Sequence, residues 1–113
     1  MKYVLLLHDV EARWLVMSEA EQGEVFARHM AYTDALVKAG AMVAGEPLEP
    51  AASAKIVRDG KVQDGPFADS KEQLGGFYVI EAASEAEAID WAKRCPSLPG
   101  GAVEVRPVPD YGG

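Results

Sequence analysis

The sequence has a single cysteine among its 113 residues, and it has no long hydrophobic run. The one thiol, Cys95, cannot form a disulfide within the chain or build a multi-cysteine metal site. It lies on the apolar stripe of a predicted helix, so we expect it to be buried and unreactive. The apolar run Val4–Leu7 is far shorter than the ~20 residues of a membrane span. No signal-peptide pattern is present, and we expect a cytoplasmic protein.

Basic side chains are also few. The chain has 11 Lys and Arg against 18 Asp and Glu, which gives a formal net charge of −7. Nucleic-acid binding requires neutralisation of phosphates, and anionic membrane surfaces attract basic segments. The charge balance therefore argues against both partners. Neither a glycine-rich phosphate loop nor a spacing of metal ligands is found, so we expect no metal and no cofactor.

The composition that remains is typical of a globular protein. Apolar residues make up 49% of the chain and charged residues 26%, which is too apolar for a disordered segment. The length fits one domain, and we expect it to span residues 1–113. No internal repeat or linker interrupts it.

The first half of the chain predicts a strand followed by a long helix. Lys2–His8 is apolar on both faces, as in a strand that is covered twice. Ser18 and Glu21 fit a capping box that begins the helix, and Gly40 ends it. One arc of this helix is apolar, and we expect it to be buried. The arc consists of Phe26, Met30, Thr33 and Val37, and it is widened by Val25, Leu36 and Ala39.

The second half contains a hairpin, a strand, a shorter helix and a last strand. Asp59-Gly60 favours the tight turn of a two-residue hairpin. Ser84 and Glu87 fit a second capping box, and Pro96 ends the helix that begins there. The further predicted strands are 41–46, 55–58, 61–63, 77–81 and 102–108.

This order of elements predicts the fold. Two βαβ halves with an inserted β-hairpin indicate a ferredoxin-like α+β sandwich, with both helices on one face of an antiparallel sheet. The other face has no cover within the chain. We therefore expect a homodimer through the open sheet face.

His29 is the strongest candidate for acid–base chemistry. It lies about 60° from Phe26 on the helix, at the border of the apolar arc. Histidine titrates near neutral pH, so a histidine that lines a cavity can act as a general acid or base. The alternative is a buried neutral imidazole bonded to a carbonyl or carboxylate. His8 and Asp9 point to opposite faces of their strand, and we expect no pair between them.

Four charged residues are further candidates. Asp64 begins the rigid string Asp64-Gly65-Pro66-Phe67, which either locks the hairpin to the next strand or places Asp64 at a pocket mouth. Glu46 follows a strand and is a candidate pocket carboxylate. Lys71 and Arg94 are candidate anchors for an anionic substrate. The alternative for these last three is ordinary solvated charge, and Arg94 also complements a helix dipole.

Several strings of the sequence together resemble the DGPF-motif branch of the YCII-related proteins. They are Met1–Leu7, Gly45-Glu46, Asp64–Phe67, Lys71–Tyr78, Arg94–Pro96 and Val103–Pro107. The resemblance covers nearly the whole chain. It implies a dimeric α+β barrel, which agrees with the fold predicted above.

The resemblance also implies a function. The wider superfamily has a proposed His–Asp pair in a cleft, and one member resembles a dehydrochlorinase acting on a ring-cleavage or lactone-type product. His29 matches the helix position of that histidine, and Asp64, then Glu46, are the carboxylates considered as its partner. Members of the DGPF branch are often encoded beside extracytoplasmic-function sigma factors, which implies a regulatory link.

Two functions are therefore expected. The first is a cofactor-free enzyme that abstracts a proton next to a carbonyl of a small carbonyl or carboxylate compound, giving elimination or isomerisation. His29 would be its base, Asp64 or Glu46 would orient it, and Lys71 or Arg94 would anchor the substrate.

The alternative is a non-catalytic ligand-binding or regulatory module linked to a sigma factor. An exposed apolar patch at Trp14, Leu15 and Val16 would serve such a module, because patches of this kind mark interfaces. We favour the enzyme.

Overall fold

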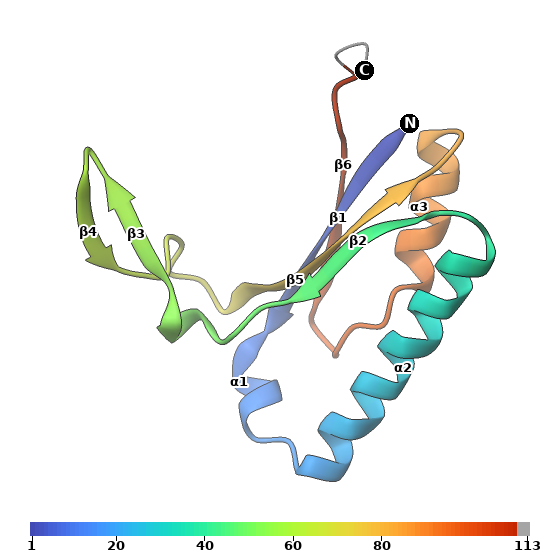
Figure 1. Cartoon of the computed structure of the whole chain (residues 1–113). Helices are drawn as coiled ribbons and strands as arrows, with labels where there is room; N and C mark the ends of the chain where they lie inside the picture. The colour runs from blue at the N-terminus through green and yellow to red at the C-terminus, as the bar shows by residue number, and fades with distance from the viewer. Residues whose placement is uncertain (111–113) are drawn as a thin grey trace.

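A four-stranded antiparallel sheet forms the body of the molecule, with the strand order β2-β5-β1-β6 (Figure 1). The computed structural model describes residues 1–110. Its elements are β1 (Lys2–Val10), α1 (Glu11–Leu15), α2 (Glu19–Lys38), β2 (Met42–Pro47), the 3-10 turn η1 (Ala51–Ser53), β3 (Lys55–Arg58), β4 (Lys61–Asp64), β5 (Glu72–Glu81), α3 (Glu85–Arg94) and β6 (Ala102–Pro107). Both long helices lie on the same face of the sheet. The expected α+β architecture is confirmed, and it is consistent with a ferredoxin-like fold.

The core lies between this face of the sheet and the two helices. The central pairs of the sheet join Leu5 to Tyr78 on one side and to Val105 on the other. Leu5, Leu36 and Ile80 are fully buried. The rest of the core consists of Tyr3, Leu7, Tyr32, Ala41, Tyr78, Ala82, Ala88, Trp91 and Cys95. This packing fixes α2 across β5 and β1, where the polar cluster described below is found.

Helix α2 begins and ends as predicted. The Ser18 hydroxyl accepts a hydrogen bond from the Glu21 N–H, and the Glu21 carboxylate accepts one from the Ser18 N–H. Gly40 follows the helix with a φ of +71°, a conformation that glycine adopts without strain. At α3, the Glu87 carboxylate accepts from the N–H of Ala83 instead of that of Ser84, so the second capping box forms only in part.

The prediction of the buried face of α2 was wrong at the centre of the face, whereas Leu36 at its edge is fully buried and Val25 is partly buried. Phe26 is 55% exposed, Met30 70% and Val37 59%. The stripe that faces the sheet is rotated about the helix axis relative to the predicted arc. Its members are more buried toward the C-terminal end of the helix. It consists of Val25, His29, Tyr32 and Leu36, at the i, i+4, i+7 and i+11 spacing of a buried helix face. His29 therefore belongs to the sheet-facing stripe.

The hairpin formed by β3 and β4 stands away from the sheet (Figure 1). Asp59 and Gly60 both have positive φ, 52° and 74°, as the predicted tight turn requires. The strand β5 begins at Glu72, five residues before the predicted Phe77, because Glu72 and Gln73 continue the pairing with β1.

The second face of the sheet carries no helix among residues 1–110. Val4, Leu6, Phe77 and Val79 form its partly buried centre. At its border, Glu104 lies 2.9 Å from His8 Nε2 and 3.0 Å from Arg106 Nε. Within the described chain, none of the helices combines the length and the hydropathy that crossing a membrane requires.

Candidate functional site

A carboxylate lies at the end of β1, on the side of the sheet that the helices cover. Asp9 follows Leu5 and Leu7 in the alternation of the strand, whereas His8 points to the opposite face and bonds Glu104. The expectation that His8 and Asp9 do not pair is therefore confirmed. The alternation itself is the signal that could have singled out Asp9 from the sequence.

One glycine makes room for this carboxylate, and a second lies beside it. A Cβ built on Gly101 would lie 2.7 Å from Asp9 Oδ1, and one built on Gly75 would lie 3.5 Å from Oδ2. Gly75 stands beside Asp9 because β5 is bulged opposite the step from Leu7 to His8, and bulges of this kind often occur next to active sites. The Asp9 carboxylate is thus enclosed by backbone on two sides.

His29 reaches the sheet from α2 and contacts Tyr78. Its Nδ1 lies 2.8 Å from the Tyr78 hydroxyl, and the two rings are stacked with their centroids 6.0 Å apart. Gly45 permits this position, because a Cβ there would lie 2.8 Å from the Tyr78 ring. The Tyr78 hydroxyl also interacts with Thr33. Within residues 1–110, His29 Nε2 has no hydrogen-bond partner.

Burial and charge together set the protonation of this cluster. Burial lowers the pKa of His29, and the negative charge of Asp9 raises it by a smaller amount. Burial also raises the pKa of Tyr78, which keeps the phenol protonated. The cluster therefore combines a neutral imidazole, a neutral phenol and a nearby carboxylate near neutral pH.

The charge of the Asp9 carboxylate also acts on Cys95. Burial raises the pKa of the Cys95 thiol to about 12, and the charge of Asp9 adds to the effect. A thiol with this pKa is not a nucleophile at neutral pH. The prediction of a buried, unreactive cysteine is confirmed in this sense.

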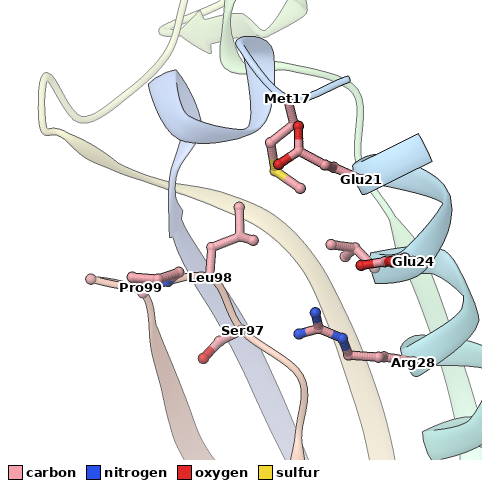
Figure 2. A pocket seen from close by; sticks show the side chains of 10 residues that line it. Met17, Glu21, Glu24, Arg28, Ser97, Leu98 and Pro99 are labelled. Atoms are coloured by element: carbon pink, nitrogen blue, oxygen red, sulfur yellow. The ribbon is translucent and has the colours of Figure 1, made fainter. Parts of the chain in front are cut away.

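A cavity of about 560 Å³ opens between α2 and the loop that connects α3 to β6 (Figure 2). Its lining consists of Met17, Glu21, Glu24, Val25, Arg28, Ser97, Leu98, Pro99, Gly100 and Gly101. Gly101 connects the cavity with the polar cluster, because it lines the cavity and also lies against Asp9. Val25 is shared with the sheet-facing stripe, in which His29 is the next member. The cavity therefore reaches the backbone beside Asp9, but Asp9, His29 and Tyr78 are not among its lining residues.

Comparison with known proteins gives the family of the chain. The model of the YCII-related domain matches residues 1–111. The chain belongs to the YCII-related family. An uncharacterized protein, R00369, of Rhizobium meliloti (strain 1021) is 36% identical over 119 residues, which cover 98% of this chain and 94% of that protein. The name of that protein states no activity.

The other residues that the sequence singled out lie apart from His29. Asp64 is 85% exposed on the hairpin, where its Oδ1 lies 2.5 Å from Lys55 Nζ. Glu46 is exposed on β2 opposite Phe77, and Lys71 is exposed in the connection before β5. The Arg94 guanidinium lies 4.4 Å from the centroid of the Trp91 ring.

None of these four residues forms a hydrogen bond or ion pair with His29 in the part of the chain that the structure describes. Instead, the structure brings Asp9 and Tyr78 to His29, and it turns Arg28 into the neighbouring cavity. Tyr78 and Arg28 had no signal in the sequence, because their proximity depends on how α2 crosses the sheet. No three His, Cys, Asp or Glu side chains among residues 1–110 are arranged to hold a metal ion.

Proposed function

We propose that this YCII-related protein catalyses cofactor-free proton transfer next to a carbonyl, which leads to elimination or isomerisation of a small carbonyl or carboxylate compound. The observation that carries the proposal is His29. It is a partly buried imidazole with a lowered pKa, and its Nδ1 is occupied by Tyr78 whereas its Nε2 has no partner among the described residues. A neutral imidazole with one free nitrogen is suited to act as a general base.

The proton transfer follows from this hydrogen bond. In the tautomer whose Nδ1–H donates to the Tyr78 oxygen, Nε2 holds the lone pair that takes the substrate proton. The C–H bond breaks, an Nε2–H bond forms, and the electron pair moves into the carbonyl to give an enolate. The enolate then expels a leaving group from the β-carbon, or it takes the proton back from Nε2 at another carbon.

Asp9 is suited to support this base, in the role that the sequence gave to Asp64. Its negative charge favours the imidazolium that forms when Nε2 takes a proton. Asp64 pairs with Lys55 on the hairpin, and Glu46 lies on β2 opposite Phe77. We propose the cytoplasm as its location, on the sequence grounds given above.

The test is hydrogen–deuterium exchange at carbon, followed by ¹H NMR in D₂O. Phenylacetone and phenylpyruvate are suitable probes, since both carry benzylic protons next to a ketone. We expect His29→Gln to slow the enzyme-dependent exchange by about 10²–10⁴-fold. His8→Gln is the matched control, because His8 lies on the other sheet face, and it should keep the wild-type rate. Exchange that persists in His29→Gln would refute the proposal, as would wild-type protein that never exceeds the buffer rate.

We also propose that two copies associate through the open sheet face. The proposal is supported by the apolar centre of this face, in particular Val4, Leu6 and Val79, which no helix of the described chain covers. Light scattering should give twice the chain mass of 12.1 kDa. Val79→Lys should give monomers, whereas Val57→Lys on the exposed hairpin should not. A monomeric wild-type protein would contradict the proposal.

A regulatory module is the second candidate function. Leu15 and Val16 are exposed, and Trp14 packs edge-on against the exposed Phe26 with ring centroids 6.0 Å apart. An apolar surface of this kind is suited to a protein partner such as a sigma factor. A purified extracytoplasmic-function sigma factor should then bind the wild type and lose affinity for Trp14→Ala. Equal binding to both proteins, or to neither, would refute this function.

A further inference from the structure

Arg28 has no ion-pair partner among residues 1–110. It lies one residue before His29 and lines the cavity beside α2. Glu24 precedes it by one turn, at the spacing where Glu and Arg commonly pair on a helix. Even so, the ion pairs among residues 1–110 do not include Arg28. Figure 2 shows its guanidinium turned across the hollow, toward the loop that carries Ser97.

The rest of the lining supplies an apolar end and a connection to the cluster. Figure 2 shows the side chains of Leu98 and Met17 at the end of the hollow away from Arg28. Gly101 forms part of the wall and lies against Asp9. A ligand held by Arg28 would therefore lie beside the polar cluster that contains His29. A volume of about 560 Å³ is within the usual range for small-molecule sites.

We infer that this cavity binds a small monocarboxylate, whose carboxylate is held by Arg28. The planar guanidinium matches a carboxylate with two parallel hydrogen bonds. Glu21 and Glu24 lie on the same wall. Their charges oppose any anion, and they oppose a dianion such as phosphate about twice as strongly as a monocarboxylate. The remaining body of the ligand is apolar, to fit Leu98 and Met17. As the substrate class of the reaction proposed above, a monocarboxylate rests on that proposal. The binding of a monocarboxylate at Arg28 does not depend on it.

Calorimetric titration with a matched pair of probes tests the inference. Phenylpyruvate and phenylacetone share the benzyl ketone, and only phenylpyruvate carries a carboxylate. We expect phenylpyruvate to bind the wild type more tightly than phenylacetone and inorganic phosphate. Arg28→Gln should raise the Kd of phenylpyruvate about 10- to 100-fold and leave phenylacetone unchanged. Arg28→Lys should restore part of the affinity.

Arg13→Gln is the matched control, because Arg13 is exposed on α1 and does not line the cavity. It should change neither Kd. The inference is overturned if Arg28→Gln binds phenylpyruvate like the wild type, if phenylacetone or phosphate binds as tightly, or if no phenylpyruvate binds at millimolar concentration. Circular dichroism checks that each variant is folded.

His29→Gln separates this inference from the proposed reaction. It should lose the proton exchange and still bind phenylpyruvate more tightly than phenylacetone. Binding that needs Arg28, without any exchange in the wild type, would sustain the carboxylate site and refute the reaction. Exchange that needs His29, with a Kd that does not depend on Arg28, would sustain the reaction and refute the carboxylate site.

Discussion

A single methyl group added at Gly101 should destabilise the fold at the candidate site. A Cβ there would lie 2.7 Å from Asp9 Oδ1 and 3.0 Å from the carbonyl oxygens of His8 and Leu98. Two of these three atoms belong to the backbone and cannot rotate away. Gly101 does not have a positive φ, so the cost of Gly101→Ala arises from crowding and not from its backbone conformation.

The magnitude follows from the size of the clash. Overpacking of this kind costs about 1–3 kcal/mol. The entropy of unfolding is about 2.1 cal/mol/K per residue, or about 0.24 kcal/mol/K for this chain length. Gly101→Ala should therefore lower Tm by about 4–12 °C. Because Asp9 supplies one of the three contacts, Asp9→Ala combined with Gly101→Ala should destabilise less than the sum of the single changes.

Thermal melts followed by circular dichroism measure the effect, and Gly23→Ala is the control. Gly23 lies within α2, and a Cβ there would meet nothing within 4 Å. Alanine should stabilise this helix position by up to about 1 kcal/mol, which raises Tm by up to about 4 °C. The same chemical change should thus act with opposite signs at the two glycines. The reasoning is refuted if Gly101→Ala melts at or above the wild-type temperature.

Three further predictions concern the cluster and the core. Because the pKa of His29 is lowered from 6.5, kcat/KM for proton exchange should rise with pH through a value below 6.5 and stay level above it; a limb centred above 6.5 would contradict the base assignment. Cys95, with its pKa raised to about 12, should react with a disulfide reagent at pH 8 only after unfolding, and rapid labelling of native protein would contradict its burial. Leu36→Ala, at a fully buried position, should cost about 2–5 kcal/mol in denaturant unfolding, whereas a loss below about 1 kcal/mol would be inconsistent with this core.

The fold could be predicted because its signals are local. The capping box at Ser18 and the turn at Asp59-Gly60 depend on neighbours within four residues, and both form as expected. The rotation of α2 could not be predicted in the same way. Two stripes of the helix are apolar, and the sheet selects the one that contains Tyr32, which packs against both Tyr78 and Trp91.

The site was only partly predictable, because it also depends on how α2 packs on the sheet. His29 could be singled out, since a histidine at the border of an apolar helix face is unusual. Its neighbours Asp9 and Tyr78 come from β1 and β5, which are far from α2 in the sequence. The rigid string that begins at Asp64 belongs to the hairpin and does not contact His29. There the Gly65 N–H donates a hydrogen bond to the Ala54 carbonyl. Asp9 can lie there because Gly101 leaves space for its carboxylate.

The dependence of phenylpyruvate binding on salt distinguishes a local Arg28 contact from attraction by a basic surface. The chain carries a net charge of −7, so its overall field repels a monoanion. At 0.01 M salt this field extends about 30 Å, and at 0.15 M about 8 Å. Screening should remove the long-range repulsion while it weakens the short-range contact with Arg28 less, so the affinity should stay level or rise between these concentrations. Calorimetry at the two salt concentrations measures this dependence. A steep fall in affinity would mean that long-range attraction to a basic surface holds the anion, and it would refute binding at Arg28.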